Sequence, residues 1–207
     1  MNPSTIQHDQ YTLAILAGGQ ATRMGQPKGE ITIDGKPILS YLLDRFAWPG
    51  PTLLVTAPGR EHPPSYERFT AEATDPVANL GPLRGVLTAL EHSKTPFTIV
   101  TTVDMPAIER AHLEWLAAGL HDSSSLARMT RRLTADGEQI EPFPSIFRAE
   151  ATPLIARQLT QGRRSVYRLS SESSVDCVLS PPDWNDTVWT NLNNPTDVER
   201  FNESLAP

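Results

Sequence analysis

The sequence predicts an α/β domain with a mainly parallel central sheet and helices on both faces of it. Three short apolar segments are typical of buried strands, and they alternate with segments whose apolar residues recur at helical spacing. Strands that alternate with helices usually pair in parallel, because each helix returns the chain to the same end of the sheet. The chain has 207 residues, 39% of them hydrophobic, so one core suffices and we expect a single domain over 1–207.

The first half carries the clearest pattern. The apolar segments 11–17, 52–57 and 97–103 are too short for ordinary helices and are predicted as strands. Between them, 37–47 and 82–92 each begin with proline and continue with helical spacing. Proline is well tolerated at the first position of a helix, where its missing N–H has no partner to lose.

The second half is less regular. Asp136 and Gly137 form a turn signal between two extended stretches and predict a hairpin. Gly162 and Pro195 mark a helix end and a helix start. The predicted helices of this half cover 110–120, 149–161 and 196–205.

Composition excludes several classes of protein. Eighteen basic residues against 24 acidic ones give a net charge of −6, which argues against a nucleic-acid-binding protein. The single cysteine, Cys177, excludes an internal disulfide, and the five histidines lack a zinc-ligand spacing. No signal peptide or run of the roughly 20 apolar residues of a membrane span is present, so we expect a soluble cytoplasmic protein.

The first predicted strand ends in a glycine-rich loop, LAGGQATRMGQPKGE, at 16–30. In open α/β sheets ligands bind beyond the carboxyl ends of the strands. Glycines let backbone N–H groups approach an anion, and Arg23 and Lys28 supply positive charge, so the loop predicts a phosphate site. The stretch is neither a P-loop nor G-x-G-x-x-G, and a merely flexible loop of small residues is the alternative.

The loop, followed by DGKPILSYLLDRF, resembles the L-A-G-G-x-x-x-R-M-G-x-x-K signature of nucleotidyltransferases, specifically the molybdenum cofactor guanylyltransferase (MobA) family. Further matches follow in order along the chain: Asp75, GPLRG (81–85), VDMP (103–106), EPFPSIF (141–147), GRRSV (162–166) and TNLNNPTD (190–197). The resemblance implies a Rossmann-like three-layer sandwich. It also implies transfer of GMP from Mg-GTP to molybdopterin, giving molybdopterin guanine dinucleotide and pyrophosphate.

On this resemblance Arg23 and Lys28 hold the triphosphate, which suits their charge. Asp104 follows the strand 97–103 and is expected to bind Mg²⁺, for which one protein carboxylate suffices. The alternative for Asp104 is an N-cap of the helix that follows. Arg23, Lys28 and Asp104 are our candidate catalytic residues.

Asp75 is expected near guanine, because a carboxylate can accept from both N1–H and the exocyclic amine of that base. A turn-forming aspartate before proline is the alternative. The resemblance adds backbone contacts to the nucleotide from the glycine loop and the GPLRG segment. These residues are Leu16, Ala17, Gly18, Gly19, Gly81, Pro82 and Leu83.

The resemblance places the acceptor in the second half, so we expect 11–110 to bind nucleotide and 111–207 to bind the pterin. The candidate pterin-binding residues are Arg163, Arg164, Asn191 and Asn193. Paired arginines on a solvated turn, and asparagines that form turns or caps, are the alternatives. Molybdoenzymes or their chaperones are candidate protein partners.

Two features depart from the pattern. Pro58 stands where the family often has asparagine, which leaves base specificity open. Arg128, Arg131 and Arg132 form a basic stretch without an assigned role. The alternatives are a CTP-dependent molybdopterin cytidylyltransferase, a sugar-phosphate nucleotidyltransferase and a non-catalytic nucleotide-binding or adaptor protein.

Overall fold

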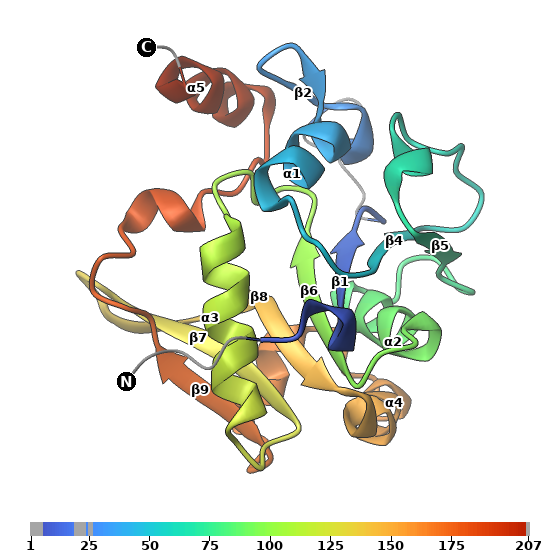
Figure 1. The fold of residues 1–207 in the computed structure, drawn as a ribbon, viewed down its shortest axis with the longest axis vertical. Coiled ribbons are helices and arrows are strands. Elements are labelled where there is room, and N and C mark those ends of the chain that lie inside the picture. Colours follow the sequence, from blue (N-terminus) through green and yellow to red (C-terminus); the bar gives the residue numbers. More distant parts are fainter. Residues whose placement is uncertain (1–5, 19–23, 25–26, 206–207) are drawn as a thin grey trace.

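The fold is a three-layer α/β sandwich around one seven-stranded sheet (Figure 1). The computed structural model describes residues 6–18, 24 and 27–205. Along the sheet the strand order is β5-β4-β1-β6-β8-β7-β9, and of these strands only β8 runs antiparallel to its neighbours. The strands of the sheet are β1 (Tyr11–Leu16), β4 (Thr52–Thr56), β5 (Ala71–Thr74), β6 (Phe97–Thr102), β7 (Ala127–Thr134), β8 (Gly137–Arg148) and β9 (Val175–Leu179).

Helices cover both faces of the sheet, which confirms the predicted fold class. On one face α1 (Ile38–Phe46) and α3 (Arg110–His121) lie together, and Arg110 donates from Nε to the carbonyl of Phe46 at 2.9 Å (Figure 1). On the other face α2 (Pro82–His92) packs against α4 (Thr152–Thr160). The chain closes with α5 (Pro195–Leu205), and a separate small hairpin pairs β2 (Thr32–Ile33) with β3 (Lys36–Pro37).

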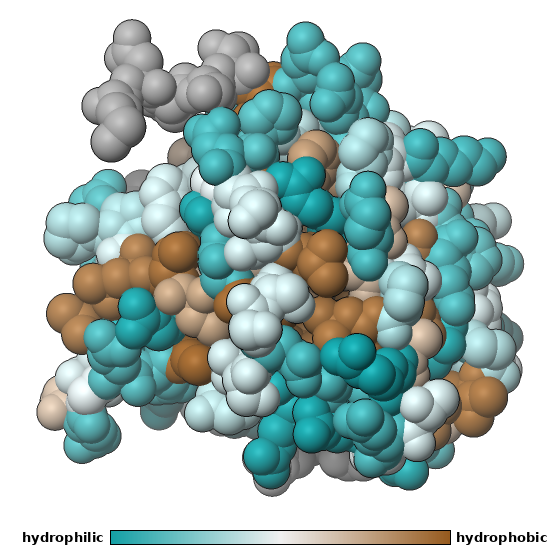
Figure 2. Space-filling model, turned by 90° about the horizontal axis from the view of Figure 1, so that it is seen from below, coloured by the Kyte–Doolittle hydropathy of each residue, from teal (hydrophilic) through white to brown (hydrophobic). Residues whose placement is uncertain are grey.

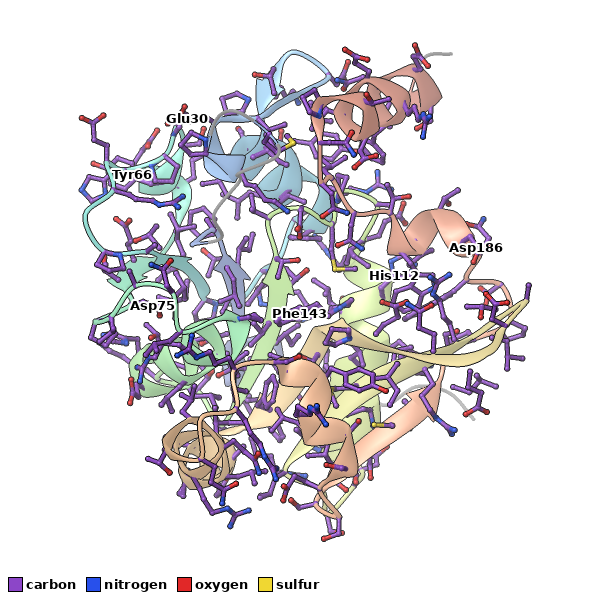
Figure 3. The ribbon with its side chains drawn as sticks, turned by 180° about the vertical axis from the view of Figure 1, so that it is seen from behind. Glu30, Tyr66, Asp75, His112, Phe143 and Asp186 are labelled. Atoms are coloured by element: carbon purple, nitrogen blue, oxygen red, sulfur yellow. The ribbon has the colours of Figure 1, made fainter. Side chains whose placement is uncertain are left out.

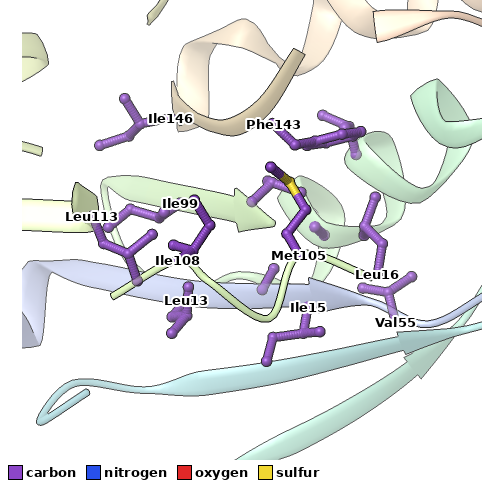
Figure 4. Packing of buried hydrophobic residues seen from close by; sticks show 14 of the residues in the cluster. Leu13, Ile15, Leu16, Val55, Ile99, Met105, Ile108, Leu113, Phe143 and Ile146 are labelled. Carbon is purple, nitrogen blue, oxygen red and sulfur yellow. The ribbon is translucent and has the colours of Figure 1, made fainter. Parts of the chain in front are cut away.

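The core lies between the sheet and its helices. Leu13 and Ile15 of β1 and Ile99 of β6 are fully buried and pack against residues of the α3 side, such as Ile108 and Leu113 (Figure 4). Every residue of β1 is buried, as expected for a central parallel strand covered on both faces. From below, the surface is mostly hydrophilic with smaller apolar patches (Figure 2).

The predicted elements of the first half are confirmed within one residue at each end. α1 begins after Pro37 because that residue still pairs with Thr32 in the small hairpin. α2 has the predicted bounds, with proline in its first turn. Within the part of the chain that the structure describes, no helix is long and apolar enough to span a membrane.

The second half contains the predicted hairpin, in which Thr134 faces Gly137 across the turn. The segment predicted as the helix 149–161 begins as a short 3-10 turn, Ala149–Ala151, before α4. Gly162 follows it with a φ of +77°, the left-handed conformation typical of a residue after a helix end. α5 includes Pro195 rather than starting behind it.

Candidate active site

A cavity of about 560 Å³ opens where the parallel strands end. Leu16, Val55 and Thr102 line it from the ends of β1, β4 and β6, and the sheet register places them side by side. In Figure 3, Asp75 and Phe143 mark two sides of this region, on either side of the strand ends. The cavity therefore occupies the edge of the sheet where open α/β domains bind ligands.

Lys28 and Asp104, which both line the cavity, form an ion pair. Their side chains are 14% and 17% exposed, so the pair is partly shielded from solvent. Thr102 donates from its hydroxyl to Oδ1 of Asp104 at 2.5 Å, which fixes the carboxylate just beyond β6. Lys28 opens a 3-10 turn, Lys28–Glu30, at the end of the glycine-rich loop. The arrangement puts one cation and one carboxylate where a phosphate chain and its counter-ion can bind.

Asp104 also anchors the C-terminal segment. Its backbone carbonyl accepts from the N–H of Leu192 at 2.9 Å, which brings the neighbouring Asn191 into the cavity lining. The amide nitrogen of Asn191 donates to the carbonyl of Trp189 at 3.0 Å, so the amide oxygen is left to face other groups. Asn191 and Asp104 are thus brought together although 87 positions separate them along the chain.

Asp75 lines the opposite side of the cavity, just after β5. The fully buried Thr88 donates from its hydroxyl to Oδ1 of Asp75 at 2.5 Å, and the same hydroxyl accepts from Arg84. Arg84 in turn pairs with Glu91. Burial raises the pKa of the Asp75 carboxyl, with the Thr88 hydrogen bond opposing that rise. A half-buried carboxylate that is oriented in this way is suited to a ligand that offers N–H donors.

Gly81 begins α2 with a φ of +77° and a ψ of 176°, a conformation reserved almost entirely for glycine. A Cβ there would lie 2.8 Å from the backbone oxygen of Arg164. That oxygen accepts from the N–H of Leu83 at 3.1 Å, and the Arg164 side chain donates to the carbonyl of Asn79 at 3.3 Å. The GRRSV segment is therefore packed directly against the start of α2.

The predicted site residues divide into three groups. Gly19 and Arg23 lie outside the described residues. Those that line the cavity are Leu16, Gly18, Lys28, Asp75, Gly81, Pro82, Asp104 and Asn191. Those that do not line it are Ala17, Leu83, Arg163, Arg164 and Asn193.

The second set has identifiable structural contacts. Leu83 is fully buried and Ala17 nearly so. Arg163 donates to the side chain of Gln158 at 2.6 Å, and with Arg164 it lines a separate hollow. The backbone N–H of Asn193 donates to Asp197 at 2.8 Å at the start of α5, the capping contact considered above as the alternative for this segment.

Two segments that line the cavity contain none of the predicted site residues. The loop 77–80 contributes all four residues, and Glu141, Pro142 and Phe143 of β8 contribute the side beyond β6. The EPFPSIF match gave a signal for the β8 residues, but that match assigned no role to any one of them. Met105 and Pro58 also line the cavity, so the proline that departs from the family pattern lies at the site.

The basic stretch is neutralised within the fold. Arg128 pairs with Asp176 at 3.2 Å, and Arg131 pairs with Glu138. Arg132 bridges two carboxylates, at 2.6 Å from Glu141 and 2.8 Å from Asp186, which is labelled in Figure 3. These partners account for all three arginines, because β7 lies between β8 and β9.

A model of the MobA-like NTP transferase domain matches residues 13–178 of the chain. The chain belongs to this family. The match runs from within β1 to within β9 and includes Lys28, Asp75, Asp104 and Glu141.

The chain is also similar to named proteins over nearly the full length of both chains. The chain is 29% identical to a molybdenum cofactor guanylyltransferase of Vibrio cholerae over 95% of this chain and 94% of that protein. It is 24% identical to a probable molybdenum cofactor guanylyltransferase of Thermococcus sibiricus, over 92% of this chain and 97% of that one.

Solved structures show the same fold. The crystal structure of molybdopterin-guanine dinucleotide biosynthesis protein A from Archaeoglobus fulgidus superposes with a TM-score of 0.78 at 22% identity, covering 93% of this chain and 97% of that one. The 2-C-methyl-D-erythritol 4-phosphate cytidylyltransferase of Thermus thermophilus superposes with a TM-score of 0.72 at 16% identity, covering 93% and 97%. The α/β nucleotidyltransferase fold is thus shared with relatives of different names.

Proposed function

We propose that the protein transfers GMP from Mg-GTP to the phosphate of molybdopterin, giving molybdopterin guanine dinucleotide and pyrophosphate. The observation that carries this proposal is the composition of one cavity, which is lined both by the half-buried carboxylate of Asp75 and by the Lys28–Asp104 ion pair. Membership of an NTP transferase family supports the reaction class. The names of relatives from Vibrio and Thermococcus support the choice of base and acceptor.

Base selection is assigned to Asp75. Its Oδ1 already accepts from Thr88, and the remaining carboxylate lone pairs can accept from N1–H and the 2-amino group of guanine. Adenine lacks that pair of neighbouring donors, and a site built to bond such donors rejects a base without them. Pro58 also lines the cavity and offers no backbone N–H donor to the base.

Asp104 fits a magnesium site that needs a single protein carboxylate. No cluster of three or more histidine, cysteine or acidic side chains suited to a metal occurs in residues 6–18, 24 and 27–205. Magnesium usually takes one or two protein carboxylates together with substrate phosphates and water, so Asp104 alone is sufficient. When bound there, magnesium would supply positive charge to the phosphates.

The chemistry then needs positioning and charge stabilisation rather than a protein nucleophile. An oxygen of the acceptor's phosphate attacks the α-phosphorus of GTP, and the bond to the bridging oxygen of pyrophosphate breaks in line. A phosphate monoester is largely ionised at neutral pH, with a second pKa of about 6, so no general base is required. Lys28, together with Arg23 of the loop, is proposed to stabilise the charge that develops on the leaving pyrophosphate.

The acceptor is proposed to bind from the side formed by the second half of the chain. Asn191 lines the cavity together with Asp104. Arg164 does not line it, but its side chain donates to the carbonyl of Asn79, which does. Arg163 and Asn193 are proposed to act further out, toward the anionic groups of the acceptor. We accordingly propose that 11–110 binds the nucleotide, that 111–207 binds the pterin, and that the reaction takes place in the cytoplasm.

The decisive experiment measures pyrophosphate release with Mg²⁺, molybdopterin and GTP, CTP or ATP in turn. Release with GTP alone supports the proposal, whereas preferred use of CTP would make the protein a cytidylyltransferase. GTP binding without release would favour the non-catalytic alternative, and release with a sugar phosphate instead of molybdopterin would reassign the acceptor.

Asp104→Ala tests the metal assignment in the same assay. We expect a fall in kcat of about 100-fold or more, the scale seen when one charge-stabilising group is removed from an active site. Asp44→Ala is the matched control. Asp44 is an exposed aspartate on α1 that pairs with Lys36 and Arg68 and does not line the cavity. Full activity of Asp104→Ala at saturating Mg²⁺ would refute the assignment.

A further inference from the structure

We propose that Glu141 recognises the amino-amide edge of the pterin ring and thereby selects the acceptor. The inference rests on the function proposed above, and adds a residue to which neither the sequence signature nor the family match gives a role. Glu141 lies in the cavity lining on β8, whereas Asp75 lies beyond β5. Three strands, β4, β1 and β6, separate β5 from β8 in the sheet, so the two carboxylates face the cavity from opposite sides.

β8 brings this side chain to the site because it runs antiparallel to β6. The two strands pair from Phe97 with Arg148 to Val100 with Ser145, so 141–143 extends beyond the paired part toward the carboxyl end of β6. The β7–β8 register shifts between Arg128, which faces Ile146, and Thr130, which faces Glu141, so 141–143 lies in an irregular part of β8. Glu141 and Phe143 both line the cavity, and they are only 7% and 8% exposed.

Glu141 is held in place by one partner and keeps one oxygen for another. Its Oε1 accepts from Nε of Arg132 at 2.6 Å, and Arg132 is itself fixed by Asp186 at 2.8 Å. In the described residues no donor reaches Oε2. This oxygen is not fully shielded from solvent, so a donor brought by a ligand can reach it and replace the solvent contact.

The pterin ring offers the donors that this carboxylate lacks. It carries an N–H between an amino carbon and a carbonyl carbon, so two N–H donors lie side by side, as they do in guanine. A carboxylate accepts from such a pair, and the flat ring can stack on the buried aromatic side chain of Phe143. The cavity would therefore bind the same kind of N–H donor pair at two places, with Asp75 on the guanine base and Glu141 on the pterin ring of the acceptor.

The test is Glu141→Gln in the transfer assay with molybdopterin and Mg-GTP. The amide keeps an acceptor for Arg132 but places a donor against the pterin donors, so KM for molybdopterin should rise roughly 10- to 100-fold, the loss expected for a charge-assisted hydrogen bond. KM and the equilibrium Kd for GTP should stay at the parent values. Glu138→Gln is the matched control, because Glu138 lies on the same strand, pairs with Arg131, is 51% exposed and does not line the cavity.

A second measurement needs no variant. In the parent enzyme, 6-hydroxymethylpterin should inhibit the transfer at least tenfold more strongly than 6-hydroxymethyllumazine, in which an oxygen replaces the 2-amino group. Equal inhibition by the two compounds, or an unchanged KM for molybdopterin in Glu141→Gln, would overturn the role of Glu141 and leave the proposed function standing. Failure of the parent to use molybdopterin at all would instead refute the proposed function.

Discussion

Replacing Gly81 by alanine should destabilise the protein more than replacing Gly162, a second exposed glycine with a positive φ. Gly81 has a φ of +77° and a ψ of 176°, and a non-glycine residue in that region costs about 1–3 kcal/mol. The added Cβ would also meet the backbone oxygen and the Cβ of Arg164 at 2.8 and 2.9 Å, so one of the two segments must move. Movement would weaken the 3.1 Å hydrogen bond from Leu83 to Arg164, worth about 0.5–1.5 kcal/mol.

Together these contributions predict a loss of roughly 2–4 kcal/mol in the free energy of unfolding. For a chain of this size each kcal/mol lowers Tm by about 2–4 °C, so the expected shift is roughly 4–16 °C. Gly162→Ala is the control for a positive φ without a close contact, because Gly162 also has a φ of +77° but no atom lies within 4 Å of the added Cβ. Thermal unfolding gives the Tm shift of each variant, and the larger shift expected for Gly81→Ala reports the contact with Arg164. Equal Tm shifts in the two variants would refute the packing of Arg164 against Gly81.

Three further results are expected. Burial raises the pKa of Asp75 above its unfolded value of about 3.9, so this group's contribution to stability falls as pH rises through the folded-state pKa. Asp75→Asn should therefore raise Tm at pH 7 relative to the parent, lose that gain below about pH 4, and bind GTP more weakly by calorimetry. Thr88→Val should cost about 1–3 kcal/mol in denaturant titration, because it leaves buried partners of the hydroxyl unpaired, and should reduce discrimination of GTP from ATP. Lys28→Met should lower kcat/KM by about 100-fold, whereas Lys36→Met, which removes an exposed ion pair, should leave turnover at the parent rate.

Local sequence patterns predicted most of the elements but not every strand of the sheet. β1, β4 and β6 are continuous apolar runs and are recognisable on their own, since both of their faces are buried. β5 and β9 have four and five residues and mixed polarity, and each becomes a strand only by pairing with a neighbour. The edges of the sheet therefore depend on tertiary contacts that no short window of sequence contains.

The candidate site divides in the same way. Lys28 and Asp104 stand in motifs that mark them, and the structure brings them into contact. Glu141 could not be singled out from the sequence, because its position depends on distant residues. Arg132 of β7 pairs with Glu141, and Asp186 in turn pairs with Arg132. Nor could the sequence show that Arg163 bonds to Gln158, because the pattern around Arg163 indicates a solvated turn and does not mark Gln158, in the predicted helix 149–161, as a buried partner.

The reversed direction of β8 has a consequence for how such enzymes can diversify. Because the strand runs from the ligand-binding edge into the sheet, its middle residues 141–143 line the cavity while its later residues pair with β6 and keep the sheet intact. Changes at 141–143 can thus alter what is accepted without touching the loop after β1 or the start of α2. The hairpin 127–148 is therefore a natural unit to exchange between relatives when the acceptor specificity is to be changed and the nucleotide-binding part is to be kept.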